Sequence, residues 1–292
     1  DDEYMLTGQS LFNSASISDN EKEGIINDIE RARYFLFEED LFHQLTREAK
    51  TLINYNVSII SNKIIIEAHN QIIEIESVLY DENNEEDLNN LYQNIGEESS
   101  MNNAKAQNIL IFLKLMLCCF YKYNLELRRS VPTARTKWKI SNSHPLILRP
   151  LLGHIRHEIN VNNVSYILQK LLSEYDSSKY QINVNKYLEL QGVENTKKIQ
   201  DIFEKSTKSP VSEIMVKFEN PESNSVLMVT IKLSATETFC NLIIDLLVER
   251  FDSISDLEKN ENGAKVVEVK VYEIYDVEEC LQWVFAKFVN QS

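Results

Sequence analysis

The sequence predicts a mixed α+β protein, with long helices and two small antiparallel sheets arranged in two packed halves. Apolar residues recur at helical spacing over several long stretches, and elsewhere they alternate with polar residues as in half-buried strands. The chain has only six glycines and five prolines in 292 residues, which favours long regular elements over a turn-rich sandwich.

The first long helix is expected after residues 1–18, a polar leader that ends at a capping Ser18 or Asp19. Its apolar residues form two stripes: Ile25, Ile29, Ala32 and Leu36, then Phe42, Leu45, Ala49 and Leu52. The second stripe lies roughly 140° further round the helix than the first. Either the helix kinks, or divides in two, around one core, or its halves face different bodies, one of them a partner.

Three short strands are expected next, at 57–60, 63–67 and 71–75, joined by two tight turns. Residues 64–104 then contain ten acids and no Lys or Arg. The centre of this tract, residues 81–87, has too little apolar surface to order itself, so we expect a solvated loop there.

A helix at 103–127 is apolar nearly all round between Ile109 and Tyr121, so we expect it to be the main buried element of the first half. As a helix this apolar run spans about 20 Å, short of the roughly 30 Å hydrocarbon core of a membrane. Cys118 and Cys119 are expected to be buried, because they lie in this helix and the cysteines show no disulfide or metal spacing. The sequence therefore indicates a soluble intracellular protein.

A basic island follows, since residues 127–157 carry seven Lys or Arg residues and no acid. Basic residues interleaved with Trp138 could bind single-stranded nucleic acid. The formal net charge of −15 disfavours nucleic acid and anionic membranes, so an acidic protein partner or the chain's own acidic tract is the better match. The candidate partner-binding residues are Arg128, Arg129, Arg135, Lys137, Trp138 and Arg149, together with Phe42 and Leu45 of the first helix.

Residues 143–157 form a connector inside the fold, with an apolar run that Pro145 and Pro150 keep extended or turn-like until Pro150. A helix is expected at about 163–175. The first half therefore spans 19–178, and a polar linker at 179–210 separates it from the second half at 211–292.

The second half alternates apolar and polar residues at 214–218, 227–233 and 267–271, which predicts three strands. Residues 239–251 keep helical spacing, and a last helix is expected from Asp276, with Glu279 completing a capping box. We expect an antiparallel sheet with helices on one face.

Catalytic signatures are absent from the sequence. It contains no phosphate-binding glycine loop, no nucleophile elbow and no zinc-protease motif, so we predict no enzyme, cofactor or metal. His154 and His157 are the only histidine pair at helical spacing, and they lack an evident third ligand. A hydrolase that uses His154 or His157 is a further hypothesis.

Three stretches resemble the carboxy-terminal part of the Mediator subunit 17 family of transcription coactivator components. They are residues 1–10, the helix and hairpin at about 21–67, and the run from Ser143 to His157 with the helical pattern that follows to Tyr175. The resemblance covers most of residues 1–175 and returns at 211–233 and at the last helix. Since the chain begins with Asp1, we expect it to be part of a longer protein.

The resemblance implies a nuclear scaffold subunit of the Mediator head module. It implies partners among the eleventh, twenty-second, eighth and sixth Mediator subunits, and help in engaging RNA polymerase II and its initiation machinery. The alternative from the residues alone is a nucleic-acid-binding module that uses the basic island.

Overall fold

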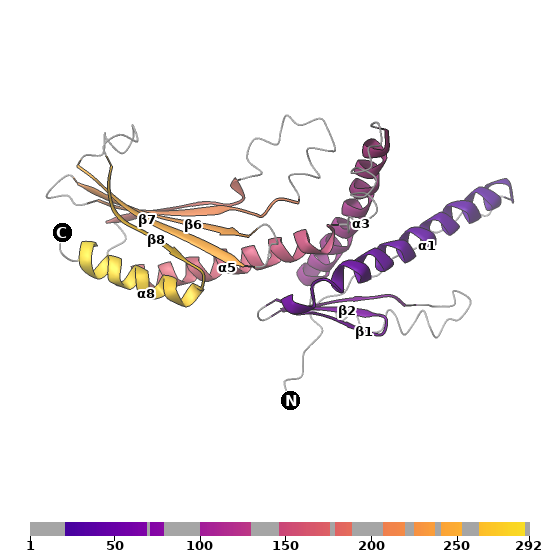
Figure 1. The fold of residues 1–292 in the computed structure, drawn as a ribbon, viewed down its shortest axis with the longest axis horizontal. Coiled ribbons are helices and arrows are strands. Elements are labelled where there is room, and N and C mark those ends of the chain that lie inside the picture. The colour runs from indigo at the N-terminus through magenta and orange to yellow at the C-terminus, as the bar shows by residue number, and fades with distance from the viewer. Residues whose placement is uncertain are drawn as a thin grey trace. The chain divides into compact units, whose positions relative to one another are not determined.

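The computed structural model describes residues 21–68, 71–78, 100–129, 146–175, 179–188, 207–219, 225–236, 241–252 and 263–289. Over these ranges the chain forms four α-helices, a three-stranded sheet and a five-stranded sheet, so the α+β prediction is confirmed (Figure 1). The chain divides into two compact units, residues 1–151 and 152–292, and the boundary falls inside helix α5 (Leu148–Leu172).

The first unit begins with one long helix and a small antiparallel sheet. Its elements are α1 (Glu21–Ala49), the short 3-10 helix η1 (Ile53–Tyr55), β1 (Val57–Ile60), β2 (Lys63–Ala68), β3 (Gln71–Glu76) and α3 (Ser100–Arg129). The strands lie in the order β1-β2-β3, with Val57 opposite Ile66 and Lys63 opposite Glu76. All three predicted strands are therefore confirmed to within one residue.

Helix α1 is uninterrupted, so the expected kink or division near residues 38–40 is wrong. Its two apolar stripes nevertheless have different surroundings. Leu45 is 1% exposed and Ala49 is fully buried, whereas Ile29 is 49% exposed and Leu36 is 64% exposed. Figure 1 shows the amino-terminal half of α1 extending clear of the three-stranded sheet. One straight helix therefore buries its second stripe and leaves its first stripe open.

Helix α3 is not the buried centre of the first half that its composition predicted. Among its described side chains only Leu113, Met116 and Leu117 are buried. Cys118 is exposed, contrary to expectation, and Cys119 is half-buried. The apolar pattern indicated burial on all sides, but the described part of the first unit buries side chains on one side of the helix.

The second unit is a five-stranded antiparallel sheet with helices on one face. Besides α5, its elements are β4 (Tyr180–Asn185), β5 (Ser212–Glu219), β6 (Val226–Ala235), β7 (Leu242–Phe251), β8 (Ala264–Val271), α8 (Ile274–Val284) and the π-helical turn η4 (Phe285–Val289). The strand order is β4-β5-β6-β7-β8, so each strand pairs with its neighbour in sequence. Helices cover one face of this sheet, as predicted, but they are α5 and α8 and not a helix at 239–251.

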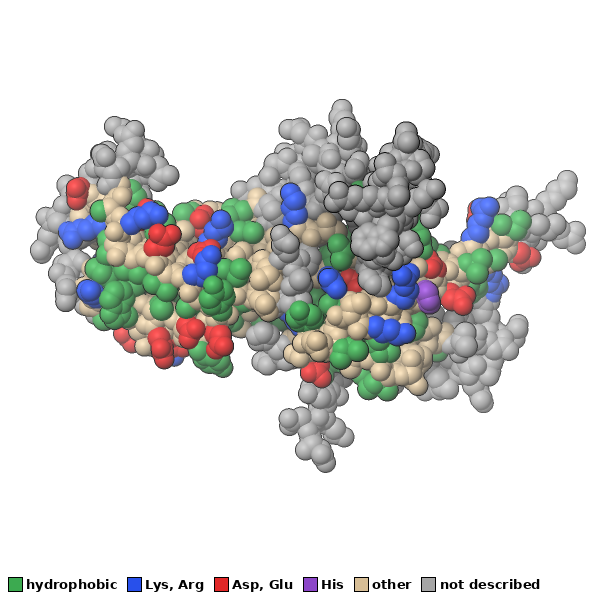
Figure 2. Space-filling model, in the orientation of Figure 1, with side chains coloured by type: hydrophobic (Ala, Val, Ile, Leu, Met, Phe, Trp, Pro, Cys, Tyr) green, Lys and Arg blue, Asp and Glu red, His purple; other side chains and the backbone are tan. Residues whose placement is uncertain are grey.

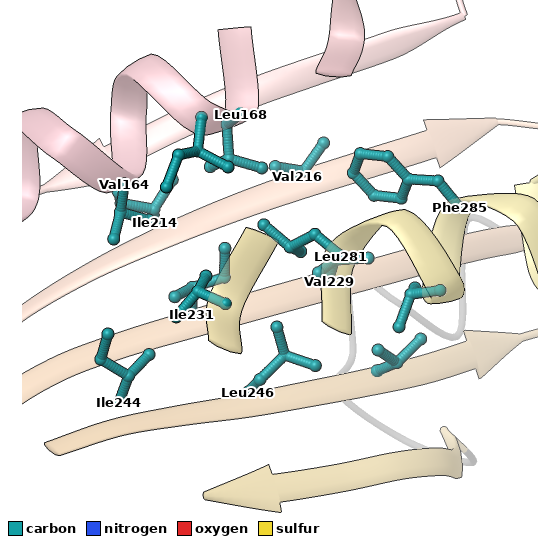
Figure 3. Packing of buried hydrophobic residues seen from close by; sticks show 14 of the residues in the cluster. Val164, Leu168, Ile214, Val216, Val229, Ile231, Ile244, Leu246, Leu281 and Phe285 are labelled. Carbon is teal, nitrogen blue, oxygen red and sulfur yellow. The ribbon is translucent and has the colours of Figure 1, made fainter. Parts of the chain in front are cut away.

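The core of the second unit lies between the sheet and these helices (Figure 3). Ile214 of β5 faces Ile231 of β6, which in turn pairs with Leu246 of β7, and all three are fully buried. Val164 and Leu168 of α5 join the same cluster, as do four residues of the last helical region: Val277, Leu281, Val284 and Phe285. The alternation in β5 and β6 therefore predicted the buried face correctly.

Four local predictions for the second half and the connector need correction. Residues 242–251 form strand β7 and not a helix, because Ile244, Leu246 and Val248 alternate into the core of a central strand. Strand β4 lies at the start of the stretch that was predicted to be a polar linker. Helix α8 begins two residues before Asp276, with no side-chain cap at Glu273. Helix α5 begins at Leu148, about fifteen residues earlier than expected, so the connector is helical before Pro150.

Candidate interaction surfaces

Helices α1 and α3 are joined by half-buried and exposed polar contacts. Lys114 of α3 forms an ion pair with Glu38 at 2.7 Å, and its Nζ donates to the Tyr34 hydroxyl at 2.9 Å. Two helical turns further along α3, the Tyr121 hydroxyl donates to the Asp40 carboxylate. Partial burial, together with that carboxylate, raises the pKa of Tyr121 to about 12. Glu38 and Asp40 of α1 therefore face α3.

The side of α3 opposite its buried residues Leu113, Met116 and Leu117 carries an apolar stripe that nothing in the described chain covers. We call it the α3 stripe; its members are Ile111, Leu115, Cys118 and Leu125, all of them exposed. Their spacing of four, three and seven residues is that of a helix surface which packs against another helix. Leu115 alone is 59% exposed. Such a row of large apolar side chains marks an interaction surface.

By length and composition, residues Asn103–Leu125 could also cross a membrane. The core helix of a soluble protein meets the same criterion, so the composition does not distinguish a membrane from a protein partner. Lys114 lies in the middle of this segment, and its ion pair with Glu38 places two charges at that level. Charges in the middle of a membrane span are costly, which favours a protein partner for the α3 stripe.

A second feature of the first unit is a buried carboxylate that caps the amino terminus of α5. Glu48 of α1 is fully buried. Its Oε2 accepts from the backbone N–H groups of Ile147 and Leu148 at 2.8 and 2.7 Å, and its Oε1 accepts from that of Arg149 at 2.9 Å. The next residue, Pro150, has no N–H to satisfy. One side chain therefore satisfies every free donor at this helix end.

Burial raises the pKa of Glu48, while the three backbone donors and the positive charge of Arg149 lower it. Arg149 also donates from its guanidinium to the Thr51 hydroxyl at 3.0 Å, and that hydroxyl donates to the Glu48 carbonyl at 2.7 Å. This network connects the end of α1 to the first residues of α5. Arg149, a predicted partner-binding residue, is thus already engaged within its own unit.

The other predicted partner-binding residues are placed as follows. Arg128 and Arg129 end α3, but their side chains lie outside the described part of the structure. Arg135, Lys137 and Trp138 also lie outside the described residues. Phe42 is half-buried. Leu45 is buried inside the first unit, so a partner could not reach it in this state.

His157 and Ser212 form the pair in the second unit that comes nearest to catalytic geometry. The His157 Nε2 lies 2.7 Å from the Ser212 hydroxyl, which also accepts from the Tyr187 backbone N–H at 3.1 Å. Ser212 is fully buried, so a substrate could not approach it. Burial, with the charges of His154 and Lys186, lowers the pKa of His157 to about 4. The pair therefore joins α5 to β5 as a structural contact.

No group of His, Cys, Asp or Glu residues in the described ranges could hold a metal ion. On the face drawn in Figure 2, acidic, basic and hydrophobic side chains are interspersed over both units. That face shows no continuous basic field over its described part, as a nucleic-acid surface would require.

Sequence reasoning missed two of the features above. The exposure of the α3 stripe was not foreseen, although its helical spacing is visible in the sequence. Glu48 had a signal too, since an acid stands beside the apolar stripe of Leu45, Ala49 and Leu52. A charge so placed must find partners when the stripe is buried.

Comparisons with known proteins agree on one family. The family model for subunit 17 of the Mediator complex matches residues 1–175. The chain is 53% identical over 291 residues to the Mediator of RNA polymerase II transcription subunit 17 of Candida albicans, covering 99% of this chain and 50% of that relative. It is 26% identical over 314 residues to the Saccharomyces cerevisiae subunit, covering 100% of this chain and 42% of that relative. The chain thus spans about half the length of the curated relatives it matches.

Proposed function

Because this chain belongs to the family of subunit 17 of the Mediator complex, we propose that it is a non-enzymatic scaffold in the head module of that coactivator. It links neighbouring head subunits, with the eleventh, twenty-second, eighth and sixth subunits as expected partners. It also helps Mediator engage RNA polymerase II and its initiation machinery in the nucleus. The work is that of an adaptor, in which surfaces fixed on rigid units hold several proteins in one geometry.

The α3 stripe is the observation that carries this proposal. Its members lie at the spacing of a helix–helix contact, and nothing in the described chain covers them. Full burial of a Leu or Ile side chain contributes roughly 1.5–3 kcal/mol. A partner helix packed along Ile111, Leu115 and Leu125 would therefore gain enough to offset a large part of the cost of association.

The first stripe of α1 provides a second surface of the same kind. Ile29 and Leu36 lie seven residues apart and are largely exposed, with the exposed Ala32 between them. The nucleic-acid alternative has less support than these two surfaces. Arg149 is the one candidate residue of the basic island whose side chain the structure describes, and it already bonds to Thr51. Two exposed helix faces in one unit suit a scaffold that receives helices from its neighbours.

The experiment is co-purification of the 292-residue chain with the carboxy-terminal segments of the eleventh and twenty-second Mediator subunits. The test variant is Leu115→Glu, and the matched control is Ile60→Glu, since Ile60 of β1 is 60% exposed and Leu115 is 59% exposed. We expect Leu115→Glu to reduce recovery of the partners at least tenfold and Ile60→Glu to leave it unchanged.

Equal recovery of the partner segments with both variants would show that the α3 stripe is not part of the interface. Flotation of the chain with phosphatidylcholine vesicles, in place of subunit binding, would assign the stripe to a membrane and overturn the proposal. Circular dichroism of each variant confirms that the helices are intact before either result is interpreted.

A further inference from the structure

The two edges of the five-stranded sheet are protected very differently. Strand β8 has charged residues at Lys265, Glu268 and Lys270, and its pairing with β7 contains a bulge at Val248/Glu249. Charges and bulges are the usual means by which an edge strand avoids pairing with another chain. Strand β4, at the other edge, has the sequence YQINVN without a single charge or proline, and no irregularity is found in its pairing with β5.

Strand β4 also exposes apolar side chains. Ile182 is opposite Val216 and Val184 is opposite Ile214, so both side chains lie on the face that the helices cover. Val216 and Ile214 are fully buried there, but Ile182 is 41% exposed and Val184 is 40% exposed. The helical cover therefore ends before it reaches the edge, and these two side chains continue the core surface outward.

The backbone of β4 has groups directed away from β5. The Glu219 N–H donates to the Lys179 carbonyl at 3.1 Å, which makes that pair a hydrogen-bonded one in the antiparallel ladder. Because such pairs alternate, residues 181, 183 and 185 also bond toward β5. The N–H and C=O groups of Tyr180, Ile182 and Val184 then point outward, where the described elements place no further strand.

The charges at the two ends of β4 indicate what could pair with it. Lys179 precedes the strand and Lys186 follows it, and both are exposed. An antiparallel pairing of two copies would bring the Lys179 of one copy near the Lys186 of the other, and each whole chain carries a formal charge of −15. The lysine pairs and the net negative charge both repel a second copy of the chain. A strand with an acidic residue at each end would instead attract both lysines.

We propose that β4 is a docking edge for an extended segment of another protein, which adds a sixth strand to this sheet. The segment alternates apolar and polar residues and has an acidic residue at each end. Its backbone bonds to the outward groups of Tyr180, Ile182 and Val184, and its apolar side chains cover Ile182 and Val184. This surface lies in the second unit and does not depend on the α3 stripe.

The test uses a labelled peptide, acetyl-Glu-Thr-Val-Thr-Ile-Thr-Val-Glu-amide, and the whole 292-residue chain. Binding is followed by fluorescence anisotropy, and slowed hydrogen exchange of the Ile182 and Val184 amides reports strand addition directly. The test variant is Ile182→Lys, and the matched control is Val269→Lys, because Val269 of β8 has a similar exposure of 37%. A second peptide carries lysine at both ends in place of glutamate.

We expect saturable binding of the acidic peptide, and at least tenfold weaker binding both by the lysine peptide and by the Ile182→Lys chain. Val269→Lys should bind the acidic peptide as the unaltered chain does. Absence of saturation up to about 1 mM peptide overturns the proposal. Equal binding of the acidic and the lysine peptide would also overturn it. A concentration-dependent dimer of the chain that Ile182→Lys abolishes would overturn it as well, because the edge would then pair with a second copy. Because the subunit co-purification uses other partners and another surface, the two proposals can fail separately.

Discussion

The contact between His157 and Ser212 makes the second unit sensitive to acid. His157 is buried against β5, and its Nε2 bonds to the Ser212 hydroxyl. Burial, the neighbouring His154 and Lys186 lower its pKa to about 4 in the folded chain, against 6.5 in the unfolded chain. Since the unfolded chain binds the proton more readily, stability falls as the pH falls through this window.

The magnitude follows from the difference between the two pKa values. A difference of about 2.5 pH units corresponds to roughly 3 kcal/mol, since each unit is worth 1.36 kcal/mol. Most of the loss occurs between pH 6.5 and pH 4, and about 2 kcal/mol is already lost at pH 5. A loss of that size is a large fraction of the stability of an ordinary domain.

The assay compares urea unfolding of the unaltered chain and of His157→Gln at pH 7, 6 and 5. Trp283 of α8 reports on the second unit once Trp138→Phe removes the other tryptophan. Between pH 7 and pH 5 the unaltered chain should lose about 2 kcal/mol more than His157→Gln. The matched control variant is His43→Gln, at an exposed position of α1. A difference below about 0.5 kcal/mol, or an NMR titration of His157 centred near pH 6.5, would refute the reasoning.

Three further predictions concern stability, each measured by urea unfolding. Glu48→Gln replaces one carboxylate oxygen by an amide group that faces the Arg149 N–H, and it should lower the free energy of unfolding by about 2 kcal/mol. The control Glu39→Gln, on the exposed side of α1, should lower it by less than about 0.5 kcal/mol. Equal losses in the two variants would contradict the capping role of Glu48. Gly263→Ala puts a methyl group 2.7 Å from the buried Phe251 ring and should cost about 1–3 kcal/mol; an unchanged midpoint would show that the ring moves freely. Leu281→Ala empties part of the core of the second unit and should cost about 2–5 kcal/mol; a cost below 1 would mean that the core collapses around the gap.

The sequence predicted the elements whose side chains alternate clearly. Strand β5 buries every second residue, as does β6 from Val229 to Leu233, and the short strands β1 to β3 are separated by turn sequences that include the left-handed Ser61. In β7, apolar residues occupy both faces, since Leu247 is half-buried on the side that the helices leave open. A continuous apolar run also contains residues at helical spacing, so the local sequence does not distinguish a strand from a helix here. The position of β7 between two other strands determines that it is a strand.

The remaining errors have causes that lie outside the local sequence. Pro150 indicated that the connector would stay extended, but a proline is tolerated in the first turn of a helix because its missing N–H needs no partner there. The other donors of that turn are satisfied by Glu48, about a hundred residues earlier in the chain. Strand β4 has too few apolar residues to be recognised alone, and it forms because β5 presents a ladder for it.

The candidate surfaces were predicted only in part. The sequence indicated two different faces on α1, and the structure identifies the first stripe, with Ile29 and Leu36, as the open one. An apolar helix such as α3 is compatible with burial in its own chain or in a partner, and composition does not distinguish the two. The decision depends on which neighbours the fold supplies.

The central claim is that this chain is a scaffold completed by other Mediator subunits. Light scattering on a sizing column tests it most directly, with the chain alone and after co-expression with the carboxy-terminal segments of the eleventh and twenty-second subunits. The scaffold account predicts a single species whose mass equals one copy of each protein, and loss of that species in the Leu115→Glu variant. A chain that elutes alone as a monomer in the presence of both segments would contradict it.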